Sequence, residues 1–204
     1  MAMKDPRDNP LIPISDIEIS QKLPGIKIVS YPELANGLPF DSQGRFILLY
    51  VTDISKDSQM GHWVCVFKKD NAIFYFDSYG NKPDEPLSWL SQNKRKSLHQ
   101  YTPYLSQHLR ATGLPVYFSP FPLQSPAHRI ATCGKHCVIR LIHKDLGIDE
   151  YAAFLKSIKK FLQTVMSIRA WFSVTTAAGK FLLMHIHRLG ALRRAVISSF
   201  PSPR

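Results

Sequence analysis

The sequence predicts an α+β fold in which a small sheet, mixed or antiparallel, packs against helices. Three apolar segments rich in β-branched and aromatic residues lie in the first half of the chain, at residues 46–51, 62–67 and 72–77. In the second half, apolar residues recur at helical spacing over residues 133–145 and 150–170. Strands that are followed by helices are typical of an α+β domain. Hydrophobic residues make up 45% of the 204 residues, which is enough to form a core.

Local composition indicates the other strands and turns. Residues 1–24 are rich in Pro and Asp and predict an irregular segment, which a short strand follows at residues 25–29. The sequence Ser-Tyr-Gly-Asn at residues 78–81 predicts a turn that ends the third apolar strand. The segments after this turn are expected to form two short helices and one further strand, at residues 84–92, 98–110 and 115–119.

Two longer helices are predicted in the C-terminal half. A loop with three prolines, over residues 120–132, leads to Thr132, which stands at the N-cap position of the helix 133–145. Gly147 marks the end of that helix. The helix 150–170 is amphipathic, because apolar residues line one side and lysines lie away from it. The apolar side is formed by Phe154, Leu155, Ile158, Phe161, Leu162, Val165 and Met166.

Charge is distributed unevenly along the chain. The formal net charge is +11, and nine of the 26 Lys and Arg residues but none of the 15 Asp and Glu residues follow Glu150. We therefore expect one domain over residues 1–150 and a basic helical extension over residues 151–204, packed in part on the same domain. Such an extension could bind DNA phosphates, or it could bind an anionic membrane or a partner's groove. It could equally be a helical appendage with a solvated basic face.

The cysteine content and the apolar segments bear on location. Three cysteines cannot form a closed set of disulfides, which predicts a reducing compartment with at least one free thiol. The N-terminal residues contain no apolar stretch of the kind found in signal peptides, and no run of 18 apolar residues occurs. We therefore expect a soluble protein, intracellular or enclosed in a virion, without a transmembrane segment.

A predicted hairpin brings a histidine close to a carboxylate. If the strands 62–67 and 72–77 are joined by a turn on Lys69-Asp70, then His62 lies directly opposite Asp77, with Cβ atoms about 5 Å apart. A carboxylate at that position would orient the imidazole and stabilise its protonated form. A three-residue loop would place Asp77 diagonally to His62, and the two residues could also simply end their strands.

Cys133 adds a nucleophile to this pair. It occupies the first turn of a predicted helix, where unpaired backbone N–H groups and the helix dipole favour a thiolate. Gly134 would leave room for a substrate backbone beside the sulfur. His62 could act as the base and Asp77 could orient it, while Gln124 and the backbone N–H of Cys133 could donate hydrogen bonds to an oxyanion. These residues form a complete set for acyl transfer, although a free cysteine can also be only a small buried apolar residue.

The other cysteines are expected to be structural. Cys65 lies within a predicted strand, and Cys137 lies one helical turn after Cys133. A metal site formed by Cys133, His136 and Cys137 lacks a second pair of ligands, so no metal is predicted. No zinc-finger, helix-turn-helix or RNA-recognition signature is present.

Four short segments, taken in order, resemble the adenovirus-type (adenain-like) cysteine proteases and their relatives in virophages, large DNA viruses and Maverick/Polinton-like elements. That family shares its fold with the SUMO-specific isopeptidases, and the resemblance covers about residues 25–150. Its order of His, acidic residue, Gln and Cys is kept here, although the interval between Gln124 and Cys133 is longer than is usual in the family. The matching segments are Gly61-His62-Trp63-Val64, Phe74-Tyr75-Phe76-Asp77-Ser78-Tyr79-Gly80, Leu123-Gln124-Ser125 and Thr132-Cys133-Gly134-Lys135-His136-Cys137.

The resemblance implies a papain-like fold with the nucleophile at a helix N-terminus. By position, Cys133 is then the nucleophile, His62 the general base, Asp77 the residue that orients it and Gln124 the oxyanion donor. Trp63 is expected to pack near the cleft, over the histidine or the substrate backbone, although it could also be an ordinary core aromatic.

The function that the resemblance implies is a thiol endopeptidase. It would cleave viral capsid or core precursor proteins during particle maturation, within the virion and the infected host cell. The chemistry needs no cofactor, although DNA or a peptide could activate the enzyme. One alternative keeps the chemistry and acts on ubiquitin-like modifiers as an isopeptidase. A second alternative, based on charge alone, is a basic nucleic-acid-binding protein without enzymatic activity.

Overall fold

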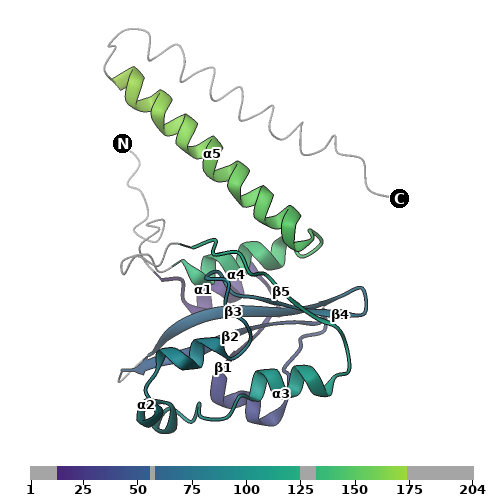
Figure 1. Ribbon diagram of the computed structural model, residues 1–204. Coiled ribbons are helices and arrows are strands. Elements are labelled where there is room, and N and C mark those ends of the chain that lie inside the picture. The colour runs from purple at the N-terminus through teal and green to yellow at the C-terminus, as the bar shows by residue number, and fades with distance from the viewer. Residues whose placement is uncertain (1–12, 56–57, 125–131, 174–204) are drawn as a thin grey trace. The chain divides into compact units, whose positions relative to one another are not determined.

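The described residues form one sheet of five strands with mixed pairing. The computed structural model describes residues 13–55, 58–124 and 132–173. The strands are β1 (Lys27–Ser30), β2 (Arg45–Ile54), β3 (Gln59–Lys69), β4 (Ala72–Phe76) and β5 (Val116–Phe118), and they lie side by side in this order (Figure 1). The outer strands β1 and β5 run parallel to their neighbours, whereas the inner pairs are antiparallel. The predicted α+β class with a mixed sheet is therefore confirmed.

Helices cover both faces of this sheet. The helical elements are α1 (Asp16–Lys22), the 3₁₀ helices η2 (Tyr31–Asn36) and η3 (Glu85–Trp89), α2 (Gln92–Ser97), α3 (Tyr104–Ala111), α4 (Cys133–Ile142) and α5 (Ile148–Ser173). In Figure 1, α1 and α4 lie on one side of the sheet, and α2 and α3 lie on the other. Side chains of β3 alternate between these faces, so Val64 and Val66 point away from the α4 side, where Cys65 contacts α4.

The main core lies between the sheet and the side that carries α3. Its buried residues are Tyr31, Leu34, Phe46, Leu48, Tyr50, Val64, Val66, Ile73, Tyr75, Leu87, Leu105 and Leu109. The other face buries Cys65, Phe67 and Phe76 beneath α4 and the start of α5, where the ring of Tyr151 lies edge-on to Phe76. The strands that pass between these two layers are buried on both faces, which is why they appear in the sequence as almost continuous apolar runs.

The N-terminal segment is more ordered than predicted. Residues 1–24 were expected to be irregular, but α1 forms within them because Ser15 and Glu18 make a capping box. The backbone N–H of Glu18 donates to Oγ of Ser15, and the backbone N–H of Ser15 donates to Oε2 of Glu18 at 2.9 Å. The prediction was wrong because it weighed proline content and overlooked this capping pair.

The two short helices between the third and the last predicted strand also differ from expectation. The first expected helix is only the short 3₁₀ helix η3, and α2, which was not predicted, begins at Gln92. The helix α3 begins at Tyr104 rather than at residue 98. Pro103 disfavours helical backbone at the residue before it, which delays the start of α3. Gln100, which lies between α2 and α3, is fixed to β2 instead. Its side-chain amide accepts a hydrogen bond from the backbone N–H of Val51 at 2.9 Å and donates one to the C=O of Val51 at 2.7 Å.

The turn between β3 and β4 changes the register predicted for the hairpin. The turn residues are Asp70 and Asn71, both with positive φ (49° and 58°), a conformation that Asp and Asn tolerate in tight hairpins. Lys69 consequently pairs with Ala72, and Cys65 pairs with Phe76. The prediction of a turn on Lys69-Asp70 was therefore wrong. Position 77 lies diagonally across from position 62 and not directly opposite it, the arrangement that the longer loop had implied.

The C-terminal part of the chain forms a separate compact unit. The first unit comprises Met1–Ala153 and the second Phe154–Arg204. The long helix α5 contains the predicted amphipathic segment and extends it at both ends. The rest of the predicted basic extension, after residue 173, lies outside the described residues. No helix in the described part of the chain is both long and apolar enough to cross a bilayer.

Candidate active site

The register of the sheet leaves an open position beside β3. β4 pairs with β3 only from Cys65 onward, so the described residues of β3 that precede Cys65 pair with β2 alone. His62 lies in that uncovered part of β3, and Asp77 follows β4 directly. Cys133 is the first residue of α4, the helix that packs on β3. Three segments that are far apart in the sequence therefore meet at this point.

Asp77 holds the imidazole of His62 in a fixed orientation. Nε2 of His62 lies 2.9 Å from Oδ1 of Asp77, and both side chains are buried. The same carboxylate accepts hydrogen bonds from the backbone N–H of Tyr79 at 2.7 Å and from Nδ2 of Asn81 at 3.0 Å. The thiol of Cys133 lies close enough to the same ring for the two groups to shift each other's pKa. Because Nε2 is bonded to Asp77, Nδ1 is the ring nitrogen left to interact with Cys133.

The pKa values of His62 and Cys133 shift toward each other. Burial alone would lower the pKa of His62, but the hydrogen bonds and charges of Asp77 and Cys133 outweigh it and raise the pKa to about 9. Burial alone would raise the pKa of Cys133, but His62 and the backbone N–H groups of Trp63 and Gly134 lower it below the usual value. The pair therefore favours a thiolate beside an imidazolium, which is the reactive form of a cysteine nucleophile.

Gln124 lies at the same site, held by the two residues that follow Asp77. Its backbone N–H donates to the carbonyl oxygen of Ser78 at 2.9 Å, and its Oε1 accepts from Oγ of Ser78 at 2.8 Å. Its Nε2 donates to the hydroxyl of Tyr79 at 3.1 Å. These bonds bring Gln124 to the site in spite of its long separation from Cys133 in the sequence. The intervening residues 125–131 lie outside the described part of the chain.

Gly134 and Trp63 pack closely together beside the nucleophile. A Cβ atom on Gly134 would overlap Cγ2 of Ile14 and would lie 2.9 Å from Cδ1 of Trp63. A glycine is therefore required for α4 to approach both β3 and the segment before α1. The expected role of Gly134 in admitting a substrate backbone stays a prediction, as does a role of Trp63 in binding substrate.

Two aromatic residues beside His62 were not identified from the sequence. The ring centroids of Tyr79 and Trp89 lie 5.0 and 5.1 Å from that of His62. Tyr79 also connects the site, because its backbone bonds to Asp77 and its hydroxyl to Gln124. Tyr79 belongs to the predicted turn at residues 78–81, so its position directly after Asp77 could have indicated that it lies at the site. Trp89 comes from η3, and no feature of the sequence points to it.

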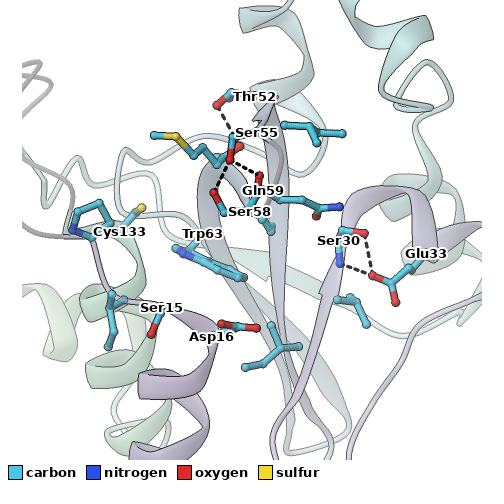
Figure 2. Close-up of a pocket in the computed structure, with 18 residues that line it drawn as sticks. Ser15, Asp16, Ser30, Glu33, Thr52, Ser55, Ser58, Gln59, Trp63 and Cys133 are labelled. Carbon is cyan, nitrogen blue, oxygen red and sulfur yellow. Dashed lines mark hydrogen bonds between the residues drawn. The ribbon is translucent and has the colours of Figure 1, made fainter.

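A cavity of about 900 Å³ opens beside Cys133 on the side of Trp63 (Figure 2). Its walls are formed by the start of α1, by β1 and η2, and by residues 52–55 and 58–61 at and beside the ends of β2 and β3. The described residues that line it are Pro13, Ile14, Ser15, Asp16, Ile28, Val29, Ser30, Glu33, Leu49, Thr52, Ile54, Ser55, Ser58, Gln59, Met60, Gly61, Trp63 and Cys133. His62 is not among them, so the cavity adjoins the nucleophile and not the base.

The remaining cysteines differ from Cys133 in their surroundings. Cys65 and Cys137 are both fully buried, and Sγ of Cys65 lies 3.9 Å from the carbonyl oxygen of Cys137. Burial raises the pKa of the Cys137 thiol well above its usual value, so that thiol stays neutral. Among the residues that the structure describes, no three His, Cys, Asp or Glu side chains form a group that could hold a metal ion.

Comparison with known proteins identifies a viral relative. No protein-family model matches the chain. The chain is 34% identical over 159 residues to "Uncharacterized protein V9" of the Sputnik virophage, and the alignment covers 75% of this chain and 89% of that protein. A contiguous stretch that covers 75% of the chain must include residues 62–133, which carry the site described above. The chain therefore belongs to the same protein family as V9 of the Sputnik virophage.

Proposed function

We propose that the protein is a papain-like, adenain-like cysteine endopeptidase that cleaves viral structural precursor proteins during particle maturation. The observation that carries the proposal is the buried contact of 2.9 Å between Nε2 of His62 and Oδ1 of Asp77. Cys133, at the N-terminus of α4, interacts electrostatically with the same imidazole. The resemblance to adenain-like proteases supports this chemistry. The similarity to a virophage protein supports a viral origin. The proposed reaction would take place in the virion and the infected cell.

The proposed reaction has two steps, each of which uses the imidazole. The Cys133 thiolate attacks the scissile carbonyl carbon, and Nδ1–H of His62 gives its proton to the leaving amine, which leaves a thioester. A water molecule then attacks the thioester carbonyl carbon, and His62 accepts a proton from that water. The C–S bond breaks, which releases the new carboxyl terminus and returns Cys133 to the thiolate beside the imidazolium. In both steps the oxyanion receives hydrogen bonds from the backbone N–H of Cys133 and from Nε2 of Gln124. Asp77 keeps the ring oriented and stabilises the imidazolium.

Thiol reactivity tests this proposal without knowledge of the substrate. Iodoacetamide labelling from pH 4 to pH 9, followed by mass spectrometry of each cysteine, is expected to show Cys133 reacting well below the pH at which an ordinary thiol ionises. Cys65 and Cys137 serve as internal controls, because both are fully buried. The substitution His62→Ala should slow the labelling of Cys133 at pH 6 by about tenfold or more. Equal, slow labelling of all three cysteines would rule out an activated pair.

A second measurement tests the positioning of Gln124 by Tyr79. Tyr79→Phe removes the hydroxyl that accepts from Nε2 of Gln124 but keeps the ring that packs on His62. We expect kcat on a cleaved peptide to fall about five- to tenfold, the size of one lost hydrogen bond, because the oxyanion donor is less well held. The labelling rate of Cys133 should not change, since the thiolate pair is untouched. Tyr117→Phe, at a half-exposed tyrosine on β5, is the matched control. An unchanged kcat in Tyr79→Phe would show that the hydroxyl of Tyr79 does not position Gln124 for catalysis.

A further inference from the structure

The cavity beside Cys133 has an acidic lining within a strongly basic chain. Its described lining residues include the carboxylates of Asp16, at the start of α1, and Glu33, in η2, but no Lys, Arg or His. The chain as a whole carries a net charge of +11. Figure 2 shows Cys133 and Trp63 on one side of the cavity, Glu33 on the other side, and Asp16 below the ring of Trp63. Glu33 therefore lies across the cavity from the nucleophile, whereas Asp16 lies beside Trp63.

Neither carboxylate is neutralised by a basic side chain in the part of the chain that the structure describes. Oε2 of Glu33 accepts hydrogen bonds from the backbone N–H and the hydroxyl of Ser30, both at 2.7 Å. Oδ1 of Asp16 accepts from the backbone N–H of Ile17 at 2.9 Å. The described residues form no salt bridge to either group, and both side chains are exposed. Each carboxylate is thus fixed at one oxygen, and its charge remains available to a ligand.

The rest of the lining suits an extended peptide. Apolar surface comes from Ile28, Val29 and Trp63, and β1, which supplies the first two, is the edge strand of the sheet. An extended chain that lies beside an edge strand can pair with its free backbone groups and place alternate side chains into pockets. The cavity volume, about 900 Å³, is sufficient for several residues of such a peptide.

The position of His62 indicates which half of a substrate the cavity would hold. A general acid must lie close to the leaving amine, so the part of the substrate after the scissile bond is on the His62 side. That side carries the rings of Tyr79 and Trp89. The cavity adjoins Cys133 and Trp63 but is not lined by His62, which places it on the acyl side.

We propose that this cavity binds the residues before the scissile bond and selects peptides with a lysine or arginine at one of those positions. Asp16 and Glu33 provide the complementary charge, and the surface of Ile28, Val29 and Trp63 binds the apolar part of the same segment. This inference rests on the proposed peptidase function and adds its substrate class. The local charge of the cavity and the net charge of the chain thus predict opposite preferences. The positive net charge attracts acidic peptides at long range, whereas the cavity selects basic ones.

Cleavage-site profiling tests the inference with the full chain. The probe is a peptide library made by chymotryptic digestion of a denatured bacterial proteome, and new cleavage sites are identified by mass spectrometry. We expect Lys and Arg to be over-represented about fivefold or more at one position before the cleaved bond. This enrichment should disappear in the double variant Asp16→Asn/Glu33→Gln. Labelling of Cys133 by iodoacetamide at the wild-type rate would show that the site of the double variant is intact.

The control removes one negative charge elsewhere on the surface. Asp70→Asn makes the same chemical change at the β3–β4 turn, which does not line the cavity, and it should keep the enrichment. Enrichment of acidic residues, absence of any basic preference before the cleaved bond, or a basic preference that survives the double variant would each overturn the inference. A wild-type profile identical to that of Cys133→Ala would overturn the peptidase proposal, and the inference with it. Cleavage without basic preference overturns the inference alone.

Discussion

Cys133→Ala is expected to abolish peptide hydrolysis while leaving the fold intact. Among the described residues, Cys133 carries the only thiol that interacts with His62, and no covalent thioester can form without it. Loss of a nucleophile in sites of this kind lowers kcat by about 10⁴-fold or more. The protonated His62 keeps Asp77 as its partner, so the midpoint of urea unfolding should change little.

A second cysteine one helical turn away provides the matched control. Cys137→Ala removes a thiol of the same kind from the same helix, but it does so beneath the sheet, where the side chain is fully buried. We expect this variant to retain cleavage and to lose about 1–2 kcal/mol of unfolding free energy, because a small cavity forms in the core. If cleavage persisted in Cys133→Ala and disappeared in Cys137→Ala, Cys137 would be the nucleophile and the proposal would be wrong.

Asp77→Asn is expected to cause the second largest loss of activity, about 10²- to 10⁴-fold in kcat. The Asp77 carboxylate accepts hydrogen bonds from His62, from the backbone N–H of Tyr79 and from Asn81. In Asp77→Asn, the NH₂ group of the carboxamide would face at least one of these donors, and that hydrogen bond would be lost. Without the negative charge, burial would hold the pKa of His62 down, and the imidazolium that supports the thiolate would be lost. Peptide cleavage and the rate of Cys133 labelling at pH 6 should both fall in this variant.

The same variant has a defined effect on stability against pH. Because the pKa of His62 is raised to about 9 in the folded protein, protonated His62 contributes stability that is fully present below its unfolded value near 6.5. That contribution is lost as the pH rises through about 9. The difference in unfolding free energy between wild type and Asp77→Asn should therefore be largest below pH 6.5 and should shrink toward pH 9.5. Urea unfolding at several pH values measures it, and a difference that does not change with pH would show that His62 is not protonated.

The strands that carry the site could be predicted because their sequence pattern is strong. The apolar runs at residues 46–51, 62–67 and 72–77 all lie within observed strands or extend one by a single residue, since strands buried on both faces must be apolar throughout. The start of α4 at Cys133 was likewise predicted from helical spacing and from Thr132 at the N-cap position. Thr132 occupies that position without a side-chain cap hydrogen bond.

The contact between His62 and Asp77 was predicted for a partly wrong reason. The prediction placed the two residues opposite each other, whereas the turn at Asp70-Asn71 shifts the register by two positions. The contact survives because β4 ends at Phe76, which frees Asp77 from the ladder and allows its side chain to reach back across to β3. The point at which a strand leaves its partner depends on tertiary packing, and local composition does not encode it.

Residues that join the site from unrelated segments could not be predicted. Trp89 reaches His62 from η3, and Ile14 reaches Gly134 from the segment before α1. The acidic cavity likewise combines Asp16 with Glu33, which are contributed by two different helical elements. Each of these approaches depends on how helices pack on the sheet, and a single sequence carries no periodic signal for such contacts.

The separation between β3 and α4 along the chain has a consequence for biosynthesis. Translation proceeds from the N-terminus, so the imidazole and its carboxylate emerge from the ribosome well before the sulfur of Cys133. Until α4 docks on the finished sheet, that sulfur is an ordinary weakly reactive thiol. Under the proposed function, the growing polypeptide would therefore have no hydrolase activity toward neighbouring nascent chains before α4 has docked.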